Sequence, residues 1–385
     1  MVPTLLNPVT PVSIVSTRSG APSVTEGNLS IATFNVLNYF NGMTTRDGST
    51  TFDYKANRGA KDKRAFLLQQ ERIVSAILAM DADVVGLMEI ENDGFSQDSA
   101  IAALSSAINA SLSTDRQYQF IETTNGKGIG TDAITVGLLY RSNVVEPVSQ
   151  PLIIPMPEQK MHNGKLARMR PSLVQVFNHK VSNKDFAVAV NHFKSKGSKC
   201  AEDIAEQVSK QDAVQGSCNA LRVSAAVTLG NALNDPALPA RKVILGDLNA
   251  YSAEDPIAVL THFDDVKRGY TIMTAKNTEH DKGQPVPVKA GFGYHNLAKA
   301  FDQNGFSYWY YGSQMVGSLD HVLTSTVMLQ EAVDGTHWNI NSVEAYQLQY
   351  NQALRYFNDE KGYEFTGVGP YRSSDHDPFI ATFNL

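Results

Sequence analysis

Acidic, amide and histidine side chains recur beside the short apolar runs of this sequence. An apolar run that stops at a polar residue is typical of a buried strand reaching the edge of a sheet. Carboxylate, amide and imidazole groups are the side chains that bind divalent cations and move protons. The residues with this placement are Asn35, Glu89, His192, Asp247, Asn249, Asp320, Asp375 and His376.

The stretch GDLNAYSAEDP, residues 246–256, shows this pattern most clearly. It follows the apolar run KVIL, and Asp247 and Asn249 are two residues apart, so both side chains point the same way on an extended backbone. A carboxylate and an amide at the edge of a core are costly to desolvate unless they bind something. The alternative is an Asx turn that caps a helix beginning near Ala253–Asp255.

The other positions also have ordinary structural explanations. Asn35 is compatible with a turn, Glu89 with a surface carboxylate and His192 with a hydrogen-bonded core histidine. The stretch SSDHDP, residues 373–378, is compatible with an Asx turn before a proline. Active sites are commonly assembled from loops at one edge of a rigid sheet, so the recurrence at several strand ends favours one shared site.

Composition limits the class of protein. The chain has 385 residues, of which 42% are hydrophobic and 19% charged, as in soluble globular proteins. No run approaches the roughly 18 apolar residues of a membrane span. The N-terminus has no basic segment followed by an apolar one, so a secreted form would already have lost its signal. The net charge of −6 argues against a passive nucleic-acid binder, but it suits an enzyme whose acidic site holds a divalent cation.

The two cysteines, Cys200 and Cys218, bracket a polar stretch. Two unrelated buried thiols are one interpretation. A local disulfide is the interpretation that a polar, exposed stretch favours. It would stabilise the fold by about 3 kcal/mol in the chain-entropy model and would indicate an oxidising compartment.

Periodicity predicts one mixed α/β domain over residues 29–385, preceded by a linker-like segment, residues 1–28, rich in Pro, Ser and Thr. Helices are predicted at 66–80, 99–112 and 219–233. Strands are predicted at 29–38, 82–88, 118–122, 133–140, 172–178, 185–191, 242–245, 306–311, 318–325 and 378–383. Several of these strands are joined without a helix, which favours antiparallel pairing. Two sheets packed face to face with helices outside accommodate this set.

The order of the motifs resembles the endonuclease/exonuclease/phosphatase superfamily, which includes pancreatic deoxyribonuclease I. The resemblance lies in FNVLN at 34–38, MEIEN at 88–92, NHFKSKGS at 191–198, GDLNAYSAEDP at 246–256, SLDHVL at 318–323 and SSDHDP at 373–378. Within the superfamily, the chain is most similar to bacterial extracellular nucleases of the ExeM type. That closer likeness lies in NRGA at 57–60, QGSCNALR at 215–222, FSYWYYGSQMVGSLDHVLTS and HWNINSVEAYQLQYN.

The resemblance implies a four-layer α/β sandwich of two mixed, mainly antiparallel sheets, as in deoxyribonuclease I, that hydrolyses phosphodiesters with a divalent metal. A hard cation on oxygen ligands stabilises charge, and magnesium takes one or two carboxylates. Glu89 is therefore assigned to the metal, with Asn35 beside it and Asp375 as a contributor. Mg²⁺ or Mn²⁺ is expected, with Ca²⁺ as an additional ion. The sequence has no HExxH pair and no His–Cys cluster, which argues against zinc.

The same resemblance gives roles to the remaining residues. Asp247 is the general base or orients the attacking water, and Asn249 steadies a phosphate oxygen. His192 and His376 match the two histidines of the family, which bind the scissile phosphate and assist proton transfer. Asp320 fixes the tautomer and orientation of one imidazole.

Basic residues near these motifs are candidate contacts for the substrate phosphates. They are Arg58, Arg170, Lys194 and Lys196. The two lysines follow His192 closely and could form a local positive lip, or they could be ordinary solvated lysines. Sequence-independent nucleases need mainly contacts to the nucleic-acid backbone.

We therefore expect a secreted, monomeric, metal-dependent endonuclease that cuts extracellular DNA, mainly double-stranded, with little sequence preference, and RNA as a further substrate. The alternative keeps the fold and the metal but acts on a lipid or small phosphoester. A membrane-acting enzyme of that kind should expose an aromatic hairpin, and the nearest candidate, WYY at 309–311, fits a strand better. A binding module without catalysis would have lost acid–base residues, and the sequence keeps all of them.

Overall fold

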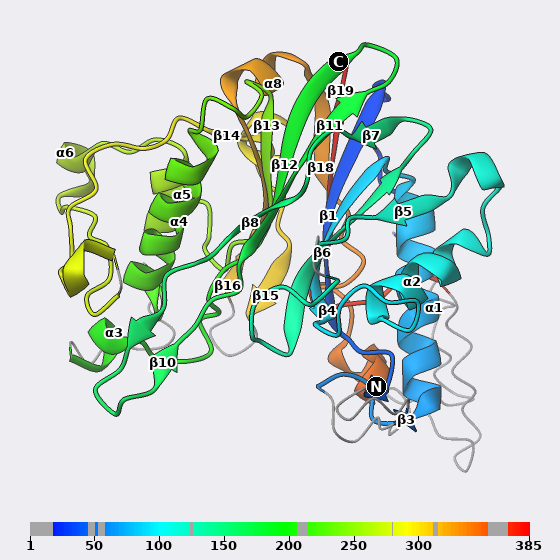
Figure 1. Cartoon of the computed structure of the whole chain (residues 1–385), viewed down its shortest axis with the longest axis horizontal. Helices are drawn as coiled ribbons and strands as arrows, with labels where there is room; N and C mark the ends of the chain where they lie inside the picture. Colours follow the sequence, from blue (N-terminus) through cyan, green and yellow to red (C-terminus); the bar gives the residue numbers. More distant parts are fainter. Residues whose placement is uncertain are drawn as a thin grey trace, which may run out of the picture.

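The computed structural model describes residues 18–44, 51–52, 58–123, 126–205, 215–278, 280–310, 315–352 and 369–385. Most of the segment predicted as a linker, residues 1–17, lies outside these ranges. Two large mixed sheets pack face to face, with helices on the outer face of each (Figure 1). The predicted fold of two mainly antiparallel sheets flanked by helices is confirmed.

The first sheet has six strands in the order β18-β19-β1-β4-β6-β5. Strands β1 and β4 run parallel, and the other neighbouring pairs run antiparallel. The strands are β1 (Leu29–Tyr39), β4 (Val84–Glu91), β5 (Tyr118–Phe120), β6 (Ile134–Arg141), β18 (Ala332–His337) and β19 (Phe379–Phe383).

The second sheet has seven strands in the order β14-β17-β13-β12-β11-β7, with β8 also paired to β11. Strands β12 and β13 run parallel, and their neighbours run antiparallel. The strands are β7 (Val145–Pro147), β8 (Leu152–Ile154), β11 (Ser172–His179), β12 (Lys184–His192), β13 (Lys242–Asp247), β14 (His295–Asn296) and β17 (Asp320–Thr324).

Helices cover the outer faces of the sandwich, with α1 and α2 on the first sheet and α4 and α5 on the second (Figure 1). Asp62 caps α1 by accepting a 2.8 Å hydrogen bond from the Ala65 N–H. The helices are α1 (Lys63–Met80), α2 (Ala100–Asn109), α3 (Ala201–Ala205), α4 (Asn219–Leu233), α5 (Asp255–Leu260), α6 (Asp265–Arg268), α7 (Leu297–Phe301) and α8 (Thr326–Gln330). Short 3₁₀ turns lie at Thr114–Arg116, His280–Gly283 and Tyr346–Leu348. Within the part of the chain that the structure describes, no helix is both long and apolar enough to cross a membrane.

Side-chain alternation on the central strands fills two separate layers of core. On β12, Val188 and Val190 belong to the core between the sheets, whereas Ala187 and Ala189 belong to the core under α4. The two sheets approach closely at Gly86, where a Cβ atom would lie 2.2 Å from Cδ1 of Leu245. This spacing holds the two sheets as one rigid support for residues at their edge.

Three short hairpin-like pairs lie outside the large sheets. They are β2 (Met43–Thr44) with β3 (Thr51–Phe52), β9 (Gln159–Lys160) with β10 (Leu166–Ala167), and β15 (Tyr308–Tyr310) with β16 (Met315–Gly317). The aromatic stretch at 309–311 thus falls in strand β15 for its first two residues, and Tyr311 lies outside the described residues.

Candidate active site

Strand directions bring the predicted site residues to one edge of the sandwich. The parallel pair β1 and β4 and the parallel pair β12 and β13 all end there. Strands β17 and β19 run antiparallel to these pairs, so their first residues lie at the same edge. Asp320 stands opposite Asp247 in the register of β17 and β13. Residues distant in sequence are thereby placed around one cavity of about 540 Å³.

Glu89 lies at an irregularity in β4. Its φ of 65° is in the left-handed region, and the pairing of β4 shifts register between Met88 and Ile90. Such a conformation is strained for a residue with a side chain and is found most often at functional sites. It turns the carboxylate into the cavity, where Oε2 accepts a 3.0 Å hydrogen bond from the Asn38 N–H.

Asn35 lies between two acids. Its Nδ2 is 3.2 Å from Oδ2 of Asp247 and 3.4 Å from Oε1 of Glu89, while its Oδ1 accepts the Leu37 N–H at 3.0 Å. The amide therefore presents hydrogen-bond donors to the acids and turns its oxygen away. In this geometry Asn35 holds the two carboxylates in place, and its position beside the metal stays a prediction.

Asp247 and Asn249 converge through a turn and not through the extended backbone that their spacing predicted. Asn249 has a φ of 47°, and its N–H donates to Oδ1 of Asp247 at 2.9 Å, which is an Asx turn. Its Nδ2 lies 3.1 Å from Oδ2 of Asp247. The turn interpretation is therefore correct in geometry, but the residue at the N-cap of α5 is Glu254. The turn aims both side chains at the cavity.

His376 is held by a buried acid. Its Nδ1 lies 2.7 Å from Oδ2 of Asp320, and its Nε2 lies 3.9 Å from Oδ2 of Asp247. Burial lowers the pKa of His376, but the charges of Asp320 and Asp247 outweigh it and raise the pKa well above the ordinary value. The two acids therefore favour the protonated form of His376. The ring of Tyr308 packs against it at 4.6 Å between centroids.

His192 has the opposite character. Its Nε2 lies 3.4 Å from Oδ2 of Asp247, and its buried Nδ1 has no hydrogen-bond partner among the described residues. Burial, helped by the charges of Arg170 and His376, lowers the pKa of His192 well below the ordinary value. The pKa values of the two histidines beside Asp247 are thus shifted in opposite directions.

A bound cation would stabilise the ionised forms of the carboxylates around the cavity. Burial, with Asp320 and Glu89 nearby, raises the pKa of Asp247 to about 7. Burial and the charge of Asp375 raise the pKa of Glu89. Oxygen donors that are costly to ionise on their own fit a hard divalent ion, and Glu89 and Asp375 both line the cavity. Asp247, Asp320 and His376 also bring ligand atoms within 4.8 Å of one another, but Asp320 and His376 already hydrogen-bond each other.

Two arginines form a basic wall of the cavity. Arg58 and Arg170 both line it, and Asp132 bridges them with contacts of 3.0 Å to Arg58 and 3.3 Å to Arg170. Arg170 also donates a 3.3 Å hydrogen bond to the carbonyl of Phe193. Sequence reasoning named both arginines and missed Asp132, because no motif marks its position in the loop before β6.

The two lysines of the predicted positive lip differ from each other. Lys196 is 6% exposed, and its ammonium group contacts the Glu254 carboxylate and lies 4.1 Å from the centre of the Tyr251 ring. Lys196 is therefore a buried ion-pair partner in the cavity wall and not part of an open lip. Lys194 is only half-buried, and burial lowers its pKa.

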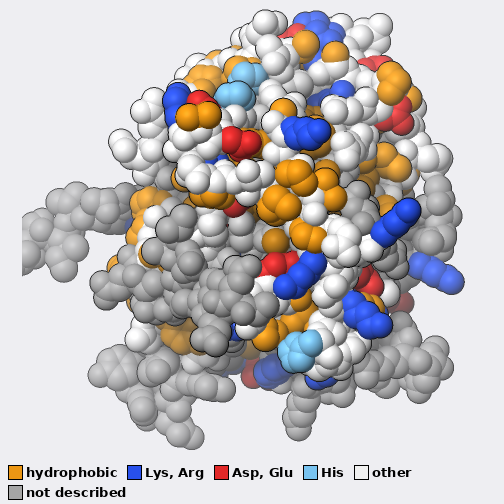
Figure 2. All heavy atoms as spheres, turned by 90° about the vertical axis from the view of Figure 1, so that its left-hand side faces the viewer, with side chains coloured by type: hydrophobic (Ala, Val, Ile, Leu, Met, Phe, Trp, Pro, Cys, Tyr) orange, Lys and Arg blue, Asp and Glu red, His pale blue; other side chains and the backbone are white. Residues whose placement is uncertain are grey.

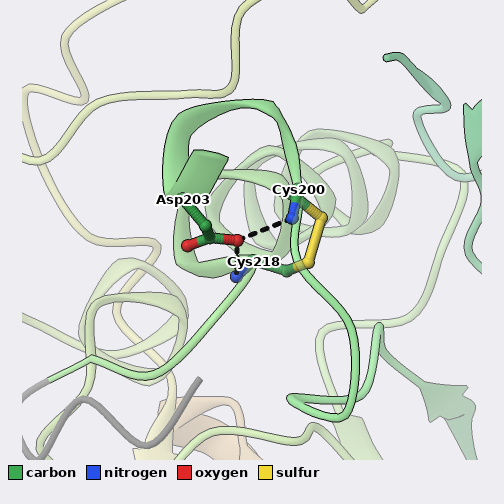
Figure 3. Close-up of side chains that lie close together, drawn as sticks. All are labelled: Cys200, Asp203 and Cys218. Carbon is green, nitrogen blue, oxygen red and sulfur yellow. Dashed lines mark hydrogen bonds between the residues drawn. A yellow bond between two sulfur atoms is a disulfide. The ribbon is translucent and has the colours of Figure 1, made fainter. Parts of the chain in front are cut away.

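Cys200 and Cys218 form the predicted disulfide (Figure 3). Both cysteines are buried, at 0% and 2% exposure. The bond was therefore predicted correctly, but the assumption that the two cysteines are exposed was wrong. Asp203 accepts the N–H of Cys200 at 2.7 Å and that of Cys218 at 2.8 Å, as the close-up shows. The disulfide ties the end of the segment that carries His192 and Lys196 to the start of α4. Residues 206–214 between the cysteines lie outside the described residues.

The face of the molecule that carries α3, α4 and α6 has a mixed surface. Lysine and arginine side chains are scattered there among acidic and hydrophobic ones (Figure 2). This agrees with the acidic net charge of −6. Two positive side chains suited to a phosphate, Arg58 and Arg170, line the cavity itself.

Comparisons with known proteins agree with this architecture. The family model for the endonuclease/exonuclease/phosphatase family matches residues 32–376. A comparison with curated proteins finds no match. An endonuclease/exonuclease/phosphatase family protein from Bacteroides thetaiotaomicron is similar at 14% identity and a TM-score of 0.51, over 94% of this chain and 99% of that one. ANGEL2, a 2',3'-cyclic phosphatase, is similar at 12% identity and a TM-score of 0.50, over 93% of this chain and 96% of that one.

At these identities the solved structures show a shared fold. The family model spans most of the sequence, from the first strand of the sandwich to His376. The chain therefore belongs to the endonuclease/exonuclease/phosphatase family.

Proposed function

We propose that this protein is a metal-dependent phosphodiester hydrolase that cuts DNA internally with little sequence preference. The observation that carries the proposal is the arrangement around Asp247. This carboxylate has a pKa of about 7 and lies 3.4 Å from a neutral His192 and 3.9 Å from a protonated His376. A base and an acid are thus held side by side, as hydrolysis of a phosphodiester requires.

Each residue has a role that its surroundings support. Asp247 accepts the proton of the attacking water, and the Asx turn to Asn249 fixes its orientation. His376 donates from Nε2 to a phosphate oxygen or to the departing oxygen, since Nδ1 is held by Asp320. His192, Arg170 and Arg58 bind the remaining phosphate oxygens from the cavity wall.

Glu89 and Asp375 would hold a divalent cation, Mg²⁺ or Mn²⁺, with Ca²⁺ as an additional ion. When bound, such an ion neutralises developing phosphate charge and lowers the pKa of a coordinated water. Asn35 keeps Glu89 and Asp247 oriented, because it donates to both. The coupling of these acids makes base function and metal binding interdependent.

The substrate is inferred to be polymeric and double-stranded DNA, with RNA as a further substrate. The cavity lies where strands of both sheets end, at the edge of the sandwich, and its two arginines suit a phosphate backbone. The buried disulfide suits an oxidising compartment, so we place the enzyme outside the cytoplasm, as a monomer of the ExeM type.

A substrate panel tests this proposal. The purified protein would be incubated with duplex DNA, RNA, sphingomyelin vesicles and a sugar phosphate, each with Mg²⁺ and with excess chelator. Cleavage of DNA only in the presence of the metal supports the proposal. Release of product from the vesicles or the sugar phosphate, with intact nucleic acids, would assign the same site to a lipid or small phosphoester.

A further inference from the structure

A second acid–histidine–serine chain lies behind Asp320, outside the catalytic cavity. Oδ2 of Asp302 lies 2.8 Å from Nδ1 of His337, and Nε2 of His337 lies 2.7 Å from Oγ of Ser318. The Ser318 hydroxyl also lies 2.7 Å from the backbone oxygen of Asp320. His337 and Ser318 are buried, at 6% and 5% exposure. The order of groups is that of a hydrolase triad.

The surroundings exclude a second hydrolytic centre here. At Gly305 a Cβ atom would lie 2.1 Å from Oδ2 of Asp302 and 2.3 Å from Nδ1 of His337, so backbone covers the pair closely. The ring of Phe379 packs edge-on against His337 at 4.8 Å. The Ser318 hydroxyl is directed at a carbonyl of its own chain. A substrate has no access to this serine, and the chain of bonds must act on the protein itself.

The available hydrogen atoms set the direction of each hydrogen bond in this chain. The Asp320 carbonyl can only accept, so the single Ser318 hydrogen is donated to it, and Nε2 of His337 must donate to Oγ. Although burial alone would raise the pKa of Asp302, hydrogen bonds from His337 hold it below the ordinary value. The ionised Asp302 then accepts the hydrogen of Nδ1. The chain of hydrogen bonds therefore runs from the Asp302 carboxylate through His337 and Ser318 to the main chain of Asp320.

Asp320 is held from its other side as well. Oγ of Ser307 accepts the N–H of Asp320 at 3.0 Å and donates to Oδ2 of the same residue at 2.7 Å. Oδ2 is also the atom that contacts His376. Ser318 and Ser307 thus fix the carbonyl, the N–H and the carboxylate of one residue, and leave little freedom to its side chain.

We propose that Asp302, His337 and Ser318 are positioning residues that lock the main chain of Asp320 and so keep its carboxylate on His376. The proposal rests on the proposed function, because it assigns their effect to the orientation of the His376 ring in the active site. His337 belongs to β18 of the first sheet and Asp320 to β17 of the second, so the lock also ties the two sheets together beside the cavity. Loosening it should weaken the contact between the Asp320 carboxylate and Nδ1 of His376.

The test compares Ser318→Ala, His337→Asn and His337→Gln with the wild-type protein. Kinetic constants for DNA cleavage would be measured across pH, together with the downfield proton NMR signal of His376 Nδ1–H, identified by its loss in His376→Asn. Ser318→Ala and His337→Asn should lower kcat by about 10-fold with little change in KM. Their kcat should stay below that of the wild-type protein at every pH, and the NMR signal should weaken, because the Asp320 carboxylate is held less firmly on Nδ1 of His376.

Two matched variants separate positioning from general stability. In His337→Gln the side-chain amide still reaches Ser318 as a donor, so this variant should keep most of the activity and the NMR signal that His337→Asn loses. Ser182→Ala removes another serine–histidine contact, in which Oγ of Ser182 lies 2.8 Å from Nδ1 of His179 at the end of β11. It should leave kcat, the pH profile and the NMR signal unchanged.

The outcomes separate this inference from the proposed function. Unchanged pH profiles and an unchanged NMR signal in Ser318→Ala and His337→Asn would overturn the positioning role. Equal losses in His337→Gln and His337→Asn would also overturn it. A wild-type protein that cuts no nucleic acid would overturn the proposed function, and the NMR signal would still decide whether Ser318 and His337 hold Asp320 on His376.

Discussion

Nδ2 of Asn35 lies 3.2 Å from Oδ2 of Asp247 and thereby joins β1 of one sheet to β13 of the other beside the cavity. The same nitrogen lies 3.4 Å from Oε1 of Glu89. One amide thus couples the acid assigned to the metal with the acid assigned to the base. A change in the charge of Glu89, including the binding of a metal ion there, is therefore expected to change the pKa of Asp247.

Replacing Glu89 by Gln should abolish cleavage and leave the fold intact. The substitution keeps the volume of the side chain and removes the carboxylate. Burial and the charge of Asp375 raise the pKa of that carboxylate, so its ionised form is costly without a metal. Without metal, the variant should melt at the wild-type temperature or above it. The rise in melting temperature on adding Mg²⁺ or Mn²⁺ should disappear, because binding to the folded state alone causes that rise. Thermal melts with and without metal measure both effects.

Glu91→Gln is the matched control for that experiment. Glu91 lies two residues further along β4, and burial with the charge of Asp93 raises its pKa to about 8, but it does not line the cavity. The control should keep both the activity and the metal-dependent melt. An active Glu89→Gln variant with an unchanged metal response would show that Glu89 is a bystander.

Asp247→Asn should lower kcat by about 10²–10⁴-fold, the range for loss of a general base. The pKa of Asp247 is raised from 3.8 to about 7 in the folded protein, so folding favours its protonated form. That contribution to stability is complete below about pH 4 and is lost as the pH rises through about 7. Metal-free wild-type protein should therefore lose stability between about pH 4 and pH 7 more steeply than Asp247→Asn. Parallel pH dependences of unfolding in the two proteins would contradict the raised pKa.

The site could be predicted from the sequence because its polar residues lie at strand ends. At a strand end a polar side chain is not needed for packing, so its presence indicates a function. Asp247, His192 and Glu89 each follow an apolar run that became a central strand. The contacts among them depended on pairing between distant strands, which spacing does not encode. The left-handed backbone conformation of Glu89 and Asn249 could likewise not be predicted from the spacing of the residues.

Short and peripheral elements were missed for a different reason. Strands β7, β8 and β14 have two or three residues each, too few for an alternating pattern to appear. The burial of Lys196 was also hidden, because its partner Glu254 lies in another segment. Ser307, Ser318 and His337 carry no motif of their own, and only the folded arrangement connects them to Asp320.

Lys196 and Arg170 should respond differently to replacement by alanine. Lys196→Ala leaves the buried Glu254 without its contact and should lower the free energy of unfolding by about 3–5 kcal/mol. Arg170→Ala should change stability less and should weaken DNA binding, with the slope of log K against log salt reduced by about 1. Urea unfolding and binding at several salt concentrations measure the two effects. If both variants reduced the slope of log K against log salt equally, Lys196 would be a phosphate contact, as the sequence predicted.

Removing the disulfide should destabilise the fold by about 3 kcal/mol, the value expected for a loop of this length. Cys200→Ala/Cys218→Ala and wild-type protein would be compared by urea unfolding. Mass spectrometry after alkylation of denatured, non-reduced protein should show no modified cysteine in material made by a secretory route. Two alkylated thiols in that material would contradict the oxidised state.

Cleavage of closed circular plasmid tests the central claim most directly. In Mg²⁺, supercoiled plasmid should pass to nicked and linear forms and then to a smear, because the cavity lies at an open edge and needs no DNA end. Excess EDTA and the Glu89→Gln variant should each leave the plasmid supercoiled. Full turnover in EDTA would contradict the metal assignment. Digestion of linear DNA while the closed circles survive would contradict internal cleavage.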